Sequence, residues 1–403
     1  MPKDRVNPFE FDVCVVGGCG HVGLPLAITF ADAGLKVSIY DINDAAIATV
    51  RAGKMPFLET GAEPVLSRVI GSMEVANEPG LIPRARFIVV VIGTPVDEHL
   101  NPTFNTMRRF FNDLLPRLVD GQCLILRSTV FPGTTAKIER MVAATGKRVH
   151  VAFCPERVAE GKAMEELRAL PQIVSGCDDT AVEMATGLFR RIAQSVIHLS
   201  PSEAELTKIF ANVWRYIQFA TANQFLMIAA NYGHDFYKIH DALTRDYPRM
   251  AGLPRSGFSA GPCLFKDTMQ LAAASDNNFA LGHSAMLINE GLPNFLVKKA
   301  KAKFPLERMT TGILGMAFKG GSDDPRESLS YKLRKVLEYE SAGCLCTDVH
   351  IQDPAFLPAD EVVARADLVF VGSPHSEYRA LRLPEGKPVV DVWNLFGKGV
   401  FPQ

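Results

Sequence analysis

The segment 256–267 contains the residue best suited to covalent chemistry, a single cysteine among small residues. Cys263 is followed by Lys266 and Asp267, and a helical pattern begins immediately afterwards. A thiol that lies just before a helix and near an ammonium group has more thiolate character and is therefore a better nucleophile. Taken alone, a single cysteine also has a simpler interpretation as a small buried hydrophobic residue.

Three polar residues lie on one face of a long helical pattern at 202–232. Glu205, Lys208 and Asn212 occupy positions i, i+3 and i+7, which brings them to the same side of a helix. They border an apolar stripe, so the simplest interpretation is a solvated helix face. The functional hypothesis is a cation and an amide directed at an oxygen that gains negative charge during hydride transfer.

A glycine-rich turn follows the first strand-like run and precedes a helical pattern. Its spacing is G-x-G-x-x-G, in which the glycines permit a tight turn, close approach of a pyrophosphate, and close packing of helix on strand. A carboxylate at the end of the next strand-like run would bind a ribose hydroxyl and repel a 2′-phosphate, so NAD is favoured over NADP. The residues predicted to bind the cofactor here are Gly18, Gly20, His21, Val22, Gly23 and Asp41.

Short β-branched runs alternate with helical patterns in the first half of the chain, as a parallel sheet requires. After Ser200-Pro201-Ser202, which has the composition of a domain boundary, one long helical pattern continues to Gly233, a residue suited to a helix end. Ser202 and Glu205 are expected to form a capping box at its start. From about residue 308 the alternation returns, so we predict two α/β domains joined by a helical segment.

The expected boundaries of these elements follow from the same patterns. Strands are expected at 12–16, 36–40, 87–92, 123–127, 148–153, 195–199, 311–314, 343–347, 368–371 and 389–392. Helices are expected at 23–33, 43–52, 202–232, 268–274, 284–304 and 328–341.

Composition excludes several classes of partner. With 43 basic and 44 acidic side chains the net charge is −1, which gives no reason to expect nucleic acid or an anionic membrane. No stretch approaches the roughly 20 apolar residues of a membrane-spanning helix, and the first residues contain no secretory h-region. The eight cysteines show no paired spacing and are interpreted as reduced thiols. We therefore expect a cytoplasmic protein without a metal site.

Taken together, these segments resemble the UDP-glucose/GDP-mannose dehydrogenase family from the first strand to Asn394. Each motif is ordinary alone, whereas the ordered set is specific. Beyond the glycine turn, the similar segments are Gly93-Thr94-Pro95, the run STVFPGTT at 128–135, Pro155-Glu156-Arg157 with Glu160-Gly161, the run AELTK at 204–208 with Asn212, Cys263 with Lys266-Asp267, and the run GMAFK at 315–319 with DPRES at 324–328.

The resemblance implies an architecture and partners. It implies two Rossmann-like parallel-sheet domains joined by a long central helix and a helical dimerisation core. The implied domains are 1–200 for NAD, 201–305 for the helical core with the nucleophile loop, and 306–403 for the UDP-sugar. A homodimer is expected, with the long helix as both spine and interface.

The resemblance also implies a reaction, in which two successive hydride transfers to NAD convert an alcohol to a carboxylate through a thiohemiacetal and a thioester on Cys263. The residues assigned to catalysis are Cys263, Lys208, Asn212, Asp267, Thr129, Glu160 and Glu156. Those assigned to the cofactor, beyond the glycine turn, are Thr94, Pro95, Thr129 and Arg326. Those assigned to the substrate are Glu156, Lys208, Asn212, Gly261, Phe318 and Lys319.

The sugar is less well defined by the resemblance. Lys266 and Asp267 at these offsets from Cys263 favour UDP-glucose, which would give UDP-glucuronate. However, the run Ala260-Gly261-Pro262 stands where the family commonly has a glycine-rich run with Ser or His. UDP-N-acetylhexosamines, or galactose-type sugars, are therefore the alternative.

Two rival functions are weaker. A one-step dehydrogenase of the 3-hydroxyacid type also places a Lys and an Asn one turn apart, but the cysteine signature and the α/β region after residue 308 argue against it. A sensor that binds without turnover would not need the polar set Lys208, Asn212, Cys263 and Asp267. The run DPRE at 324–327 has a second interpretation, as a helix N-cap, a first-turn proline and a capping-box glutamate.

Overall fold

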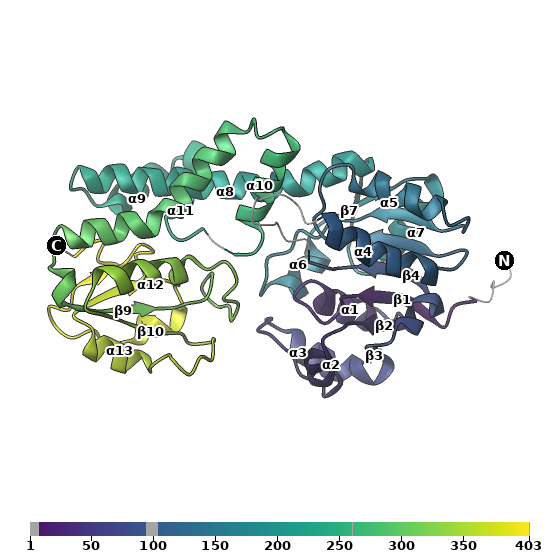
Figure 1. Ribbon diagram of the computed structural model, residues 1–403, viewed down its shortest axis with the longest axis horizontal. Helices are drawn as coiled ribbons and strands as arrows, with labels where there is room; N and C mark the ends of the chain where they lie inside the picture. Colours follow the sequence, from purple (N-terminus) through teal and green to yellow (C-terminus); the bar gives the residue numbers. More distant parts are fainter. Residues whose placement is uncertain (1–7, 94–103, 260, 403) are drawn as a thin grey trace. The chain divides into compact units, whose positions relative to one another are not determined.

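A computed structural model describes residues 8–93, 104–259 and 261–402 of the chain (Figure 1). The chain divides into two compact units, Met1–Phe210 and Ala211–Gln403, which are described separately below. Thr94, Pro95 and Ala260 lie outside the described residues. Among the residues that the structure describes, none of the helices has both the length and the apolar character needed to cross a bilayer.

The first unit is built on an eight-stranded sheet with the strand order β3-β2-β1-β4-β5-β6-β7-β8. All neighbouring strands are parallel except β6 and β7, which are antiparallel. The strands are β1 (Phe11–Val16), β2 (Val37–Tyr40), β3 (Glu74–Ala76), β4 (Ala85–Val90), β5 (Cys123–Leu126), β6 (His150–Phe153), β7 (Gln172–Gly176) and β8 (Val196–His198).

Two hydrophobic layers cover the two faces of this sheet. Val13 and Val15 of β1 belong to one layer, whereas Cys14 and Val16 belong to the other, because successive side chains of a strand point to opposite faces. The helices of the unit are α1 (Gly23–Asp32), α2 (Asp44–Arg51), α3 (Ala62–Val69), α4 (Phe104–Leu114), α5 (Thr134–Ala143), α6 (Ala163–Ala169) and α7 (Asp179–Phe189).

The long helix α8 (Pro201–Asn231) begins one residue before the predicted helix. Its capping box is formed by Ser200 and Glu203, because Ser200 N donates to Glu203 Oε2 over 2.8 Å and Glu203 N donates to Ser200 Oγ over 3.4 Å. The predicted box of Ser202 and Glu205 is therefore wrong by two residues. At the other end Gly233 has a φ of +76°, a left-handed conformation that glycine adopts at helix ends.

The second unit combines helices with a four-stranded parallel sheet of order β10-β9-β11-β12. Helices α11 and α12 pack on one face of this sheet and α13 packs on the other (Figure 1). The helices are α9 (Phe236–Thr244), α10 (Leu264–Ala274), α11 (Ala280–Lys301), α12 (Leu329–Glu340) and α13 (Ala359–Arg365). The strands are β9 (Thr310–Leu314), β10 (Gly343–Thr347), β11 (Leu368–Val371) and β12 (Val389–Val390).

The observed fold confirms the predicted class, α/β with two largely parallel sheets and a long central helix. Every predicted strand and helix is present with small shifts at its ends. Strands β3 and β7 were not among the predictions. The antiparallel β7 is also a departure from an all-parallel first sheet. Helix α6, which lies between β6 and β7, has only seven residues.

Candidate active site

The glycine turn between β1 and α1 has the shape that the sequence motif predicts. Gly17 adopts a φ of +77°. A Cβ atom on Gly18 would lie 2.7 Å from Ile39 Cγ2, and one on Gly23 would lie 2.6 Å from the Cα of Gly18, so neither position has room for a side chain. A Cβ atom on Gly20 would have its nearest neighbour, the carbonyl oxygen of Gly17, 3.8 Å away, so the backbone of Gly20 is accessible. This arrangement fits a pyrophosphate at the N-terminus of α1.

The turn also lies where an open α/β sheet normally binds its ligand. Strand β1 pairs with β2 on one side and with β4 on the other, so the chain order reverses between β1 and β4. Asp41 follows β2, and its Oδ2 accepts a hydrogen bond of 2.8 Å from Cys19 N while its Oδ1 accepts one of 3.0 Å from Asn43 N. The carboxylate is therefore held against the glycine turn.

His21 links the glycine turn to the segment that carries Glu160. His21 Nδ1 lies 2.9 Å from Glu160 Oε1, and the imidazole packs on Phe57 with 4.0 Å between ring centroids. Val22, at the N-cap of α1, is exposed. The structure thus brings two predicted site residues, His21 and Glu160, into direct contact.

A buried glutamate that the sequence analysis did not single out positions the same segment. Glu59 accepts hydrogen bonds of 2.8 Å from Gly161 N and Ala163 N, at the start of α6. It therefore fixes the backbone immediately after Glu160. Its position 102 residues earlier in the chain explains why no local pattern indicates this role.

Glu156 is buried, and its carboxylate is occupied within the first unit. It pairs with the guanidinium of Arg127, which is fully buried, and accepts hydrogen bonds from Arg157 N (2.6 Å) and Val158 N (2.9 Å). A buried charge needs such partners because it has lost its hydration. This geometry favours a supporting role for Glu156 over direct contact with a substrate.

The STVFPGTT segment is anchored from α8. Glu205 is buried and accepts hydrogen bonds from Gly133 N (2.7 Å), Thr135 N (2.7 Å) and Thr135 Oγ1 (2.6 Å) at the N-terminus of α5. Thr129 lies between β5 and this anchor and is partly buried. Glu205 is thus not part of a solvated polar face. Lys208, one turn before Asn212 on α8, is partly exposed.

In the second unit the start of α10 brings together the candidate nucleophile Cys263 and two other predicted catalytic residues, Asp267 and Asn212. Cys263 is exposed and occupies the N-cap of α10, where backbone N–H groups and the helix dipole favour negative charge. One turn later Asp267 is fully buried. Its Oδ2 accepts a hydrogen bond of 2.5 Å from Asn212 Nδ2, and its Oδ1 lies 2.8 Å from Lys266 Nζ. The ammonium of Lys266 thus neutralises Asp267.

The loop that leads to Cys263 is held by buried polar groups. Asn223 accepts a hydrogen bond of 2.9 Å from Gly257 N and donates one of 3.0 Å to Gly257 O. Further along the loop Gly261 has a φ of +102°, and a Cβ there would lie 2.5 Å from Phe318 Cδ2. Gly261 therefore permits contact between the nucleophile loop and the aromatic ring of another predicted substrate residue.

The segment after β9 carries the remaining predicted residues. Phe318 N donates to Asp324 O over 3.0 Å, and Lys319 Nζ lies 5.4 Å from the centre of the Phe318 ring. Arg326 pairs with the buried Asp324, to which its Nε donates over 2.9 Å, while more than half of the Arg326 side chain stays exposed. This pair constrains Arg326 and leaves part of its surface open to a ligand.

The N-cap of α12 is Ser328, whose side chain accepts from Ser330 N. The interpretation of DPRE as the start of that helix is therefore wrong. Glu327 has a left-handed φ of +54°, and its carbonyl accepts a hydrogen bond of 3.3 Å from Gly261 N. The run connects the nucleophile loop to the second sheet instead of beginning a helix.

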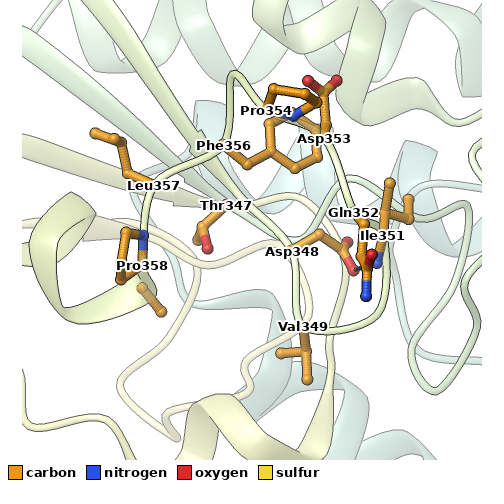
Figure 2. A pocket seen from close by; sticks show the side chains of 11 residues that line it. Thr347, Asp348, Val349, Ile351, Gln352, Asp353, Pro354, Phe356, Leu357 and Pro358 are labelled. Carbon is orange, nitrogen blue, oxygen red and sulfur yellow. Dashed lines mark hydrogen bonds between the residues drawn. The ribbon is translucent and has the colours of Figure 1, made fainter.

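A cavity of about 760 Å³ lies at the carboxyl end of β10 (Figure 2). Its lining comes from Thr347–Ala359 and includes Asp348, Gln352, Asp353 and Phe356. Strand order reverses between β9 and β11, so the loops after those two strands, not the loop after β10, are where a ligand is expected. The predicted substrate residues Phe318 and Lys319 are on the loop after β9.

Comparison with protein-family models places the whole chain in one family. The NAD binding domain of the UDP-glucose/GDP-mannose dehydrogenase family matches residues 11–193, its central domain matches 202–291, and its UDP binding domain matches 312–398. The glycine turn and Asp41 lie within the first of these ranges, and NAD is the cofactor that this domain binds.

Similar proteins span almost the full length of the chain. It is 28% identical over 387 residues to a UDP-N-acetyl-D-mannosamine dehydrogenase of Methanocaldococcus jannaschii, covering 94% of this chain and 89% of the relative. It is 26% identical to an NDP-N-acetyl-D-galactosaminuronic acid dehydrogenase of Ralstonia nicotianae, covering 94% of each. The structure of the Pyrococcus horikoshii UDP-N-acetyl-D-mannosamine dehydrogenase is similar, with 27% identity, coverage of 95% and 96%, and a TM-score of 0.88.

Proposed function

Because the chain belongs to the UDP-glucose/GDP-mannose dehydrogenase family and is an NAD-dependent nucleotide-sugar dehydrogenase, we propose that it oxidises the C6 alcohol of a UDP-N-acetylhexosamine to the uronate. The observation that carries the four-electron reaction is the cluster of Cys263, Asp267 and Asn212 at the start of α10. A nucleophilic thiol is needed only if the aldehyde is trapped and oxidised again.

The choice of sugar rests on the similar proteins. The sequence alone favours UDP-glucose. However, the relatives matched over nearly the whole chain carry the names of N-acetylated sugars, namely UDP-N-acetyl-D-mannosamine and NDP-N-acetyl-D-galactosaminuronic acid. These matches support the alternative better than UDP-glucose. UDP-N-acetylmannosamine is the first candidate within this class, and UDP-N-acetylgalactosamine is the second.

In the first oxidation the residues of α8 stabilise developing negative charge. When bound, NAD accepts one hydride from the substrate in each of the two oxidations. As the C6 hydroxyl loses its proton, Lys208 and the Asn212 amide donate to the oxygen. Asp267 orients that amide through the 2.5 Å hydrogen bond, so the donor needs no rearrangement during the reaction.

In the second oxidation Cys263 becomes covalently attached. The thiolate adds to the aldehyde carbon and forms a thiohemiacetal, which becomes a thioester when C6 loses its second hydride. Water then cleaves the C–S bond, releasing the carboxylate and regenerating the thiol. Glu160 accepts a proton from that water, and its contact with His21 holds it in place. Overall, the alcohol and one water yield the carboxylate, two hydrides and three protons.

Thr129, Glu156, Gly261, Phe318, Lys319 and Arg326 complete the proposed site. Thr129 contributes near the nicotinamide, and Glu156 supports it through Arg127. Gly261, Phe318 and Lys319 contact the nucleotide sugar, and Arg326 contributes to the cofactor site. We also propose domain boundaries at residues 200 and 305. A cytoplasmic location is proposed as well, with which the free cysteines are consistent.

We propose a homodimer that forms through α8. Trp214 and Tyr232 are 61% and 77% exposed, and Phe225 and Ile228 are also exposed. The spacings of 11 and 3 residues bring Trp214, Phe225 and Ile228 to one side of α8, and Tyr232 directly follows the helix. A row of large apolar groups on one face is typical of a surface that a second copy covers.

The substrate class is tested by measuring kcat/KM for a panel of UDP-sugars with purified protein. UDP-N-acetylmannosamine, UDP-N-acetylglucosamine, UDP-N-acetylgalactosamine and UDP-glucose form the panel. A UDP-N-acetylhexosamine should be preferred over UDP-glucose by about tenfold or more, since a site that hydrogen-bonds a group discriminates against a substrate that lacks it. Preference for UDP-glucose would overturn the choice of sugar while leaving the dehydrogenase intact.

A further inference from the structure

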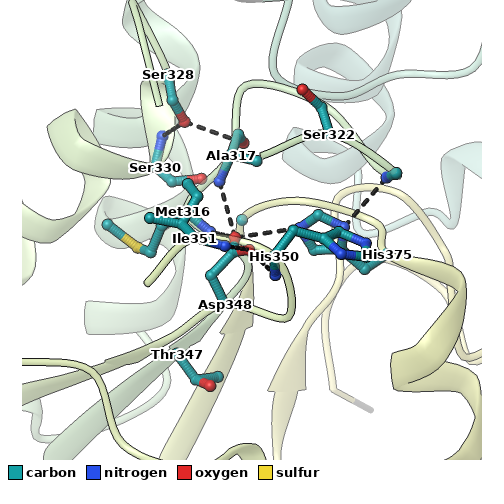
Figure 3. Close-up of polar contacts among 12 residues, drawn as sticks. Met316, Ala317, Ser322, Ser328, Ser330, Thr347, Asp348, His350, Ile351 and His375 are labelled. Carbon is teal, nitrogen blue, oxygen red and sulfur yellow. Dashed lines mark hydrogen bonds and ion pairs between the residues drawn. The ribbon is translucent and has the colours of Figure 1, made fainter. Parts of the chain in front are cut away.

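Two aspartates have equivalent places in the two sheets of this protein. Asp41 follows the second strand of the first sheet, and Asp348 follows β10, the second strand of the second sheet. Asp41 Oδ2 accepts a hydrogen bond from Cys19 N in the loop after β1. Asp348 Oδ2 accepts hydrogen bonds from Met316 N (2.6 Å) and Ala317 N (2.9 Å) in the loop after β9 (Figure 3).

The two carboxylates differ in how many donors they already satisfy. Besides the two N–H groups above, Asp348 accepts from His375 Nε2 at 3.1 Å, and its Oδ1 accepts from His350 N (2.8 Å) and Ile351 N (2.9 Å). Five donors use the lone pairs of both oxygens. Asp348 is therefore unable to bind a ribose hydroxyl as the aspartate of a dinucleotide site does. Asp41, by contrast, accepts two hydrogen bonds from described residues, one from Cys19 N and one from Asn43 N.

His375 is the partner that closes this site, and its surroundings define its tautomer. The ring is fully buried, and its Nδ1 accepts a hydrogen bond of 3.1 Å from Gly321 N. Because Nδ1 is an acceptor, the proton is on Nε2, which donates to Asp348. The imidazole thus connects Asp348 to Gly321, in the middle of the loop after β9.

The same geometry argues against a metal ion at this histidine. His350, His375 and Glu377 have ligand atoms close enough to surround an ion. However, both nitrogens of His375 already have partners, Gly321 N and Asp348 Oδ2. Coordination by His375 would break one of these bonds, so this cluster is better explained by its structural contacts.

We propose that Asp348 and His375 are positioning residues for the nucleotide moiety of the substrate. Together they hold residues 316 and 317 near the start of the loop after β9 and residue 321 in its middle. Phe318 and Lys319 lie between these two anchors. The inference rests on the proposed function, in which these two residues contact the UDP-sugar. Supporting contacts of this kind set how accurately a binding group is aligned.

The test is calorimetric titration of the full chain with UDP. NADH, titrated separately, is the control for folding of the first unit, and His350→Gln is the matched control in the second unit. In His375→Phe the hydrogen bond from Gly321 N and the hydrogen bond to Asp348 are both lost. UDP affinity should then fall about tenfold, the equivalent of one buried hydrogen bond. His375→Gln can keep the bond to Asp348, and His375→Asn can keep the bond from Gly321. Each of these variants should lose less UDP affinity than His375→Phe, and all should bind NADH within about twofold of the wild type.

His350→Gln is the matched control. The His350 ring lies 4.9 Å from that of His375, but only its backbone N–H contacts Asp348. UDP affinity should be unchanged in this variant. Equal UDP affinity in wild type and His375→Phe, with intact NADH binding, would overturn the positioning role. If His375→Phe fails to bind NADH, His375→Gln is used in its place. Equal UDP affinity in wild type and His375→Gln, with intact NADH binding, would then overturn the positioning role.

Failure of the proposed function has a different signature. If Lys319→Ala loses UDP affinity and His375→Phe does not, the substrate site stands and the positioning role is wrong. If the wild-type chain itself does not bind UDP, the proposed substrate class fails together with the inference.

Discussion

The side-chain amide of Asn212 donates a hydrogen bond of 2.5 Å to Oδ2 of Asp267, which joins the long helix α8 to the helix that begins at Cys263. Asp267 is fully buried and is neutralised by Lys266 on its other oxygen. A buried carboxylate with two such partners has little freedom to move. The pair therefore fixes the direction of the Asn212 amide before the substrate arrives.

Asn212→Ala should lower kcat by about 100- to 1,000-fold, because it removes a preorganised donor to the reacting oxygen. NADH binding should be unchanged. Steady-state kinetics with a UDP-N-acetylhexosamine measures the effect. Gln218→Ala is the control and should retain activity. It removes another side-chain amide of α8, one that donates to Gly252 O. A kcat close to the wild-type value in Asn212→Ala would remove Asn212 from the catalytic set.

Glu160→Gln should slow hydrolysis of the thioester, since an amide is unable to accept the proton of the attacking water. The acylated enzyme should then accumulate and be visible by intact-protein mass spectrometry after acid quench. Glu165→Gln, at an exposed glutamate nearby, should show no such species. If both variants turn over without an adduct, another group activates the water.

Asp348 should make the second unit sensitive to acid. Burial alone would raise the pKa of its carboxyl group, but the hydrogen bond from His375 and those from the backbone of Ile351 and His350 outweigh it, so the pKa lies well below its ordinary value. A carboxylate with a depressed pKa in the folded state stabilises the fold above its unfolded pKa of about 3.9, and this stabilisation is lost as pH falls toward the folded value.

Asp348→Asn tests this linkage. At pH 7 it should destabilise the protein by about 1–3 kcal/mol, because backbone donors lose their acceptor. The difference in melting temperature between wild type and variant should shrink as the pH is lowered from 5 to 3. Scanning fluorimetry across that range measures it, with the exposed Glu385→Gln as control. A pH-independent difference would mean that ionisation of Asp348 contributes nothing.

Trp214→Glu should weaken the dimer, because it inserts a charge into an apolar face of α8. Light scattering coupled to gel filtration should give a dimer for the wild type and a larger monomer fraction for the variant. Tyr339→Glu changes a similarly exposed aromatic residue on α12 and should not alter the mass. A monomeric wild type, or a variant dimer of unchanged stability, would contradict the proposed interface.

The sequence predicted those parts of the fold that depend on local pattern. The glycine turn was recognisable because a fixed spacing of small residues has one common structural use. Strands β3 and β7 escaped prediction because Glu74–Ala76 has only three residues and Gln172–Gly176 begins and ends with polar or small residues. The capping box was displaced because Ser200 and Ser202 are equally suitable caps, and only the structure shows that Glu205 bonds to α5 instead.

The contacts between supporting residues of the site were beyond reach of the sequence for a different reason. Arg127 and Glu156 are 29 residues apart, Glu59 and Gly161 are 102 apart, and Asp348 and His375 are 27 apart. Apart from Glu156 and Gly161, which lie in a segment similar to the family's, each of these residues looks like an ordinary polar residue in its own segment. Their roles depend on burial and on contacts that arise only after the sheets have formed.

The most direct test of the central claim is the number of NADH molecules formed for each UDP-N-acetylhexosamine consumed. Complete conversion of a limiting amount of sugar, with absorbance for NADH and chromatography for the product, gives this ratio. The four-electron route through Cys263 predicts two NADH and a UDP-uronate, and no uronate from Cys263→Ser. One NADH per sugar, or sustained uronate formation by Cys263→Ser, would contradict it.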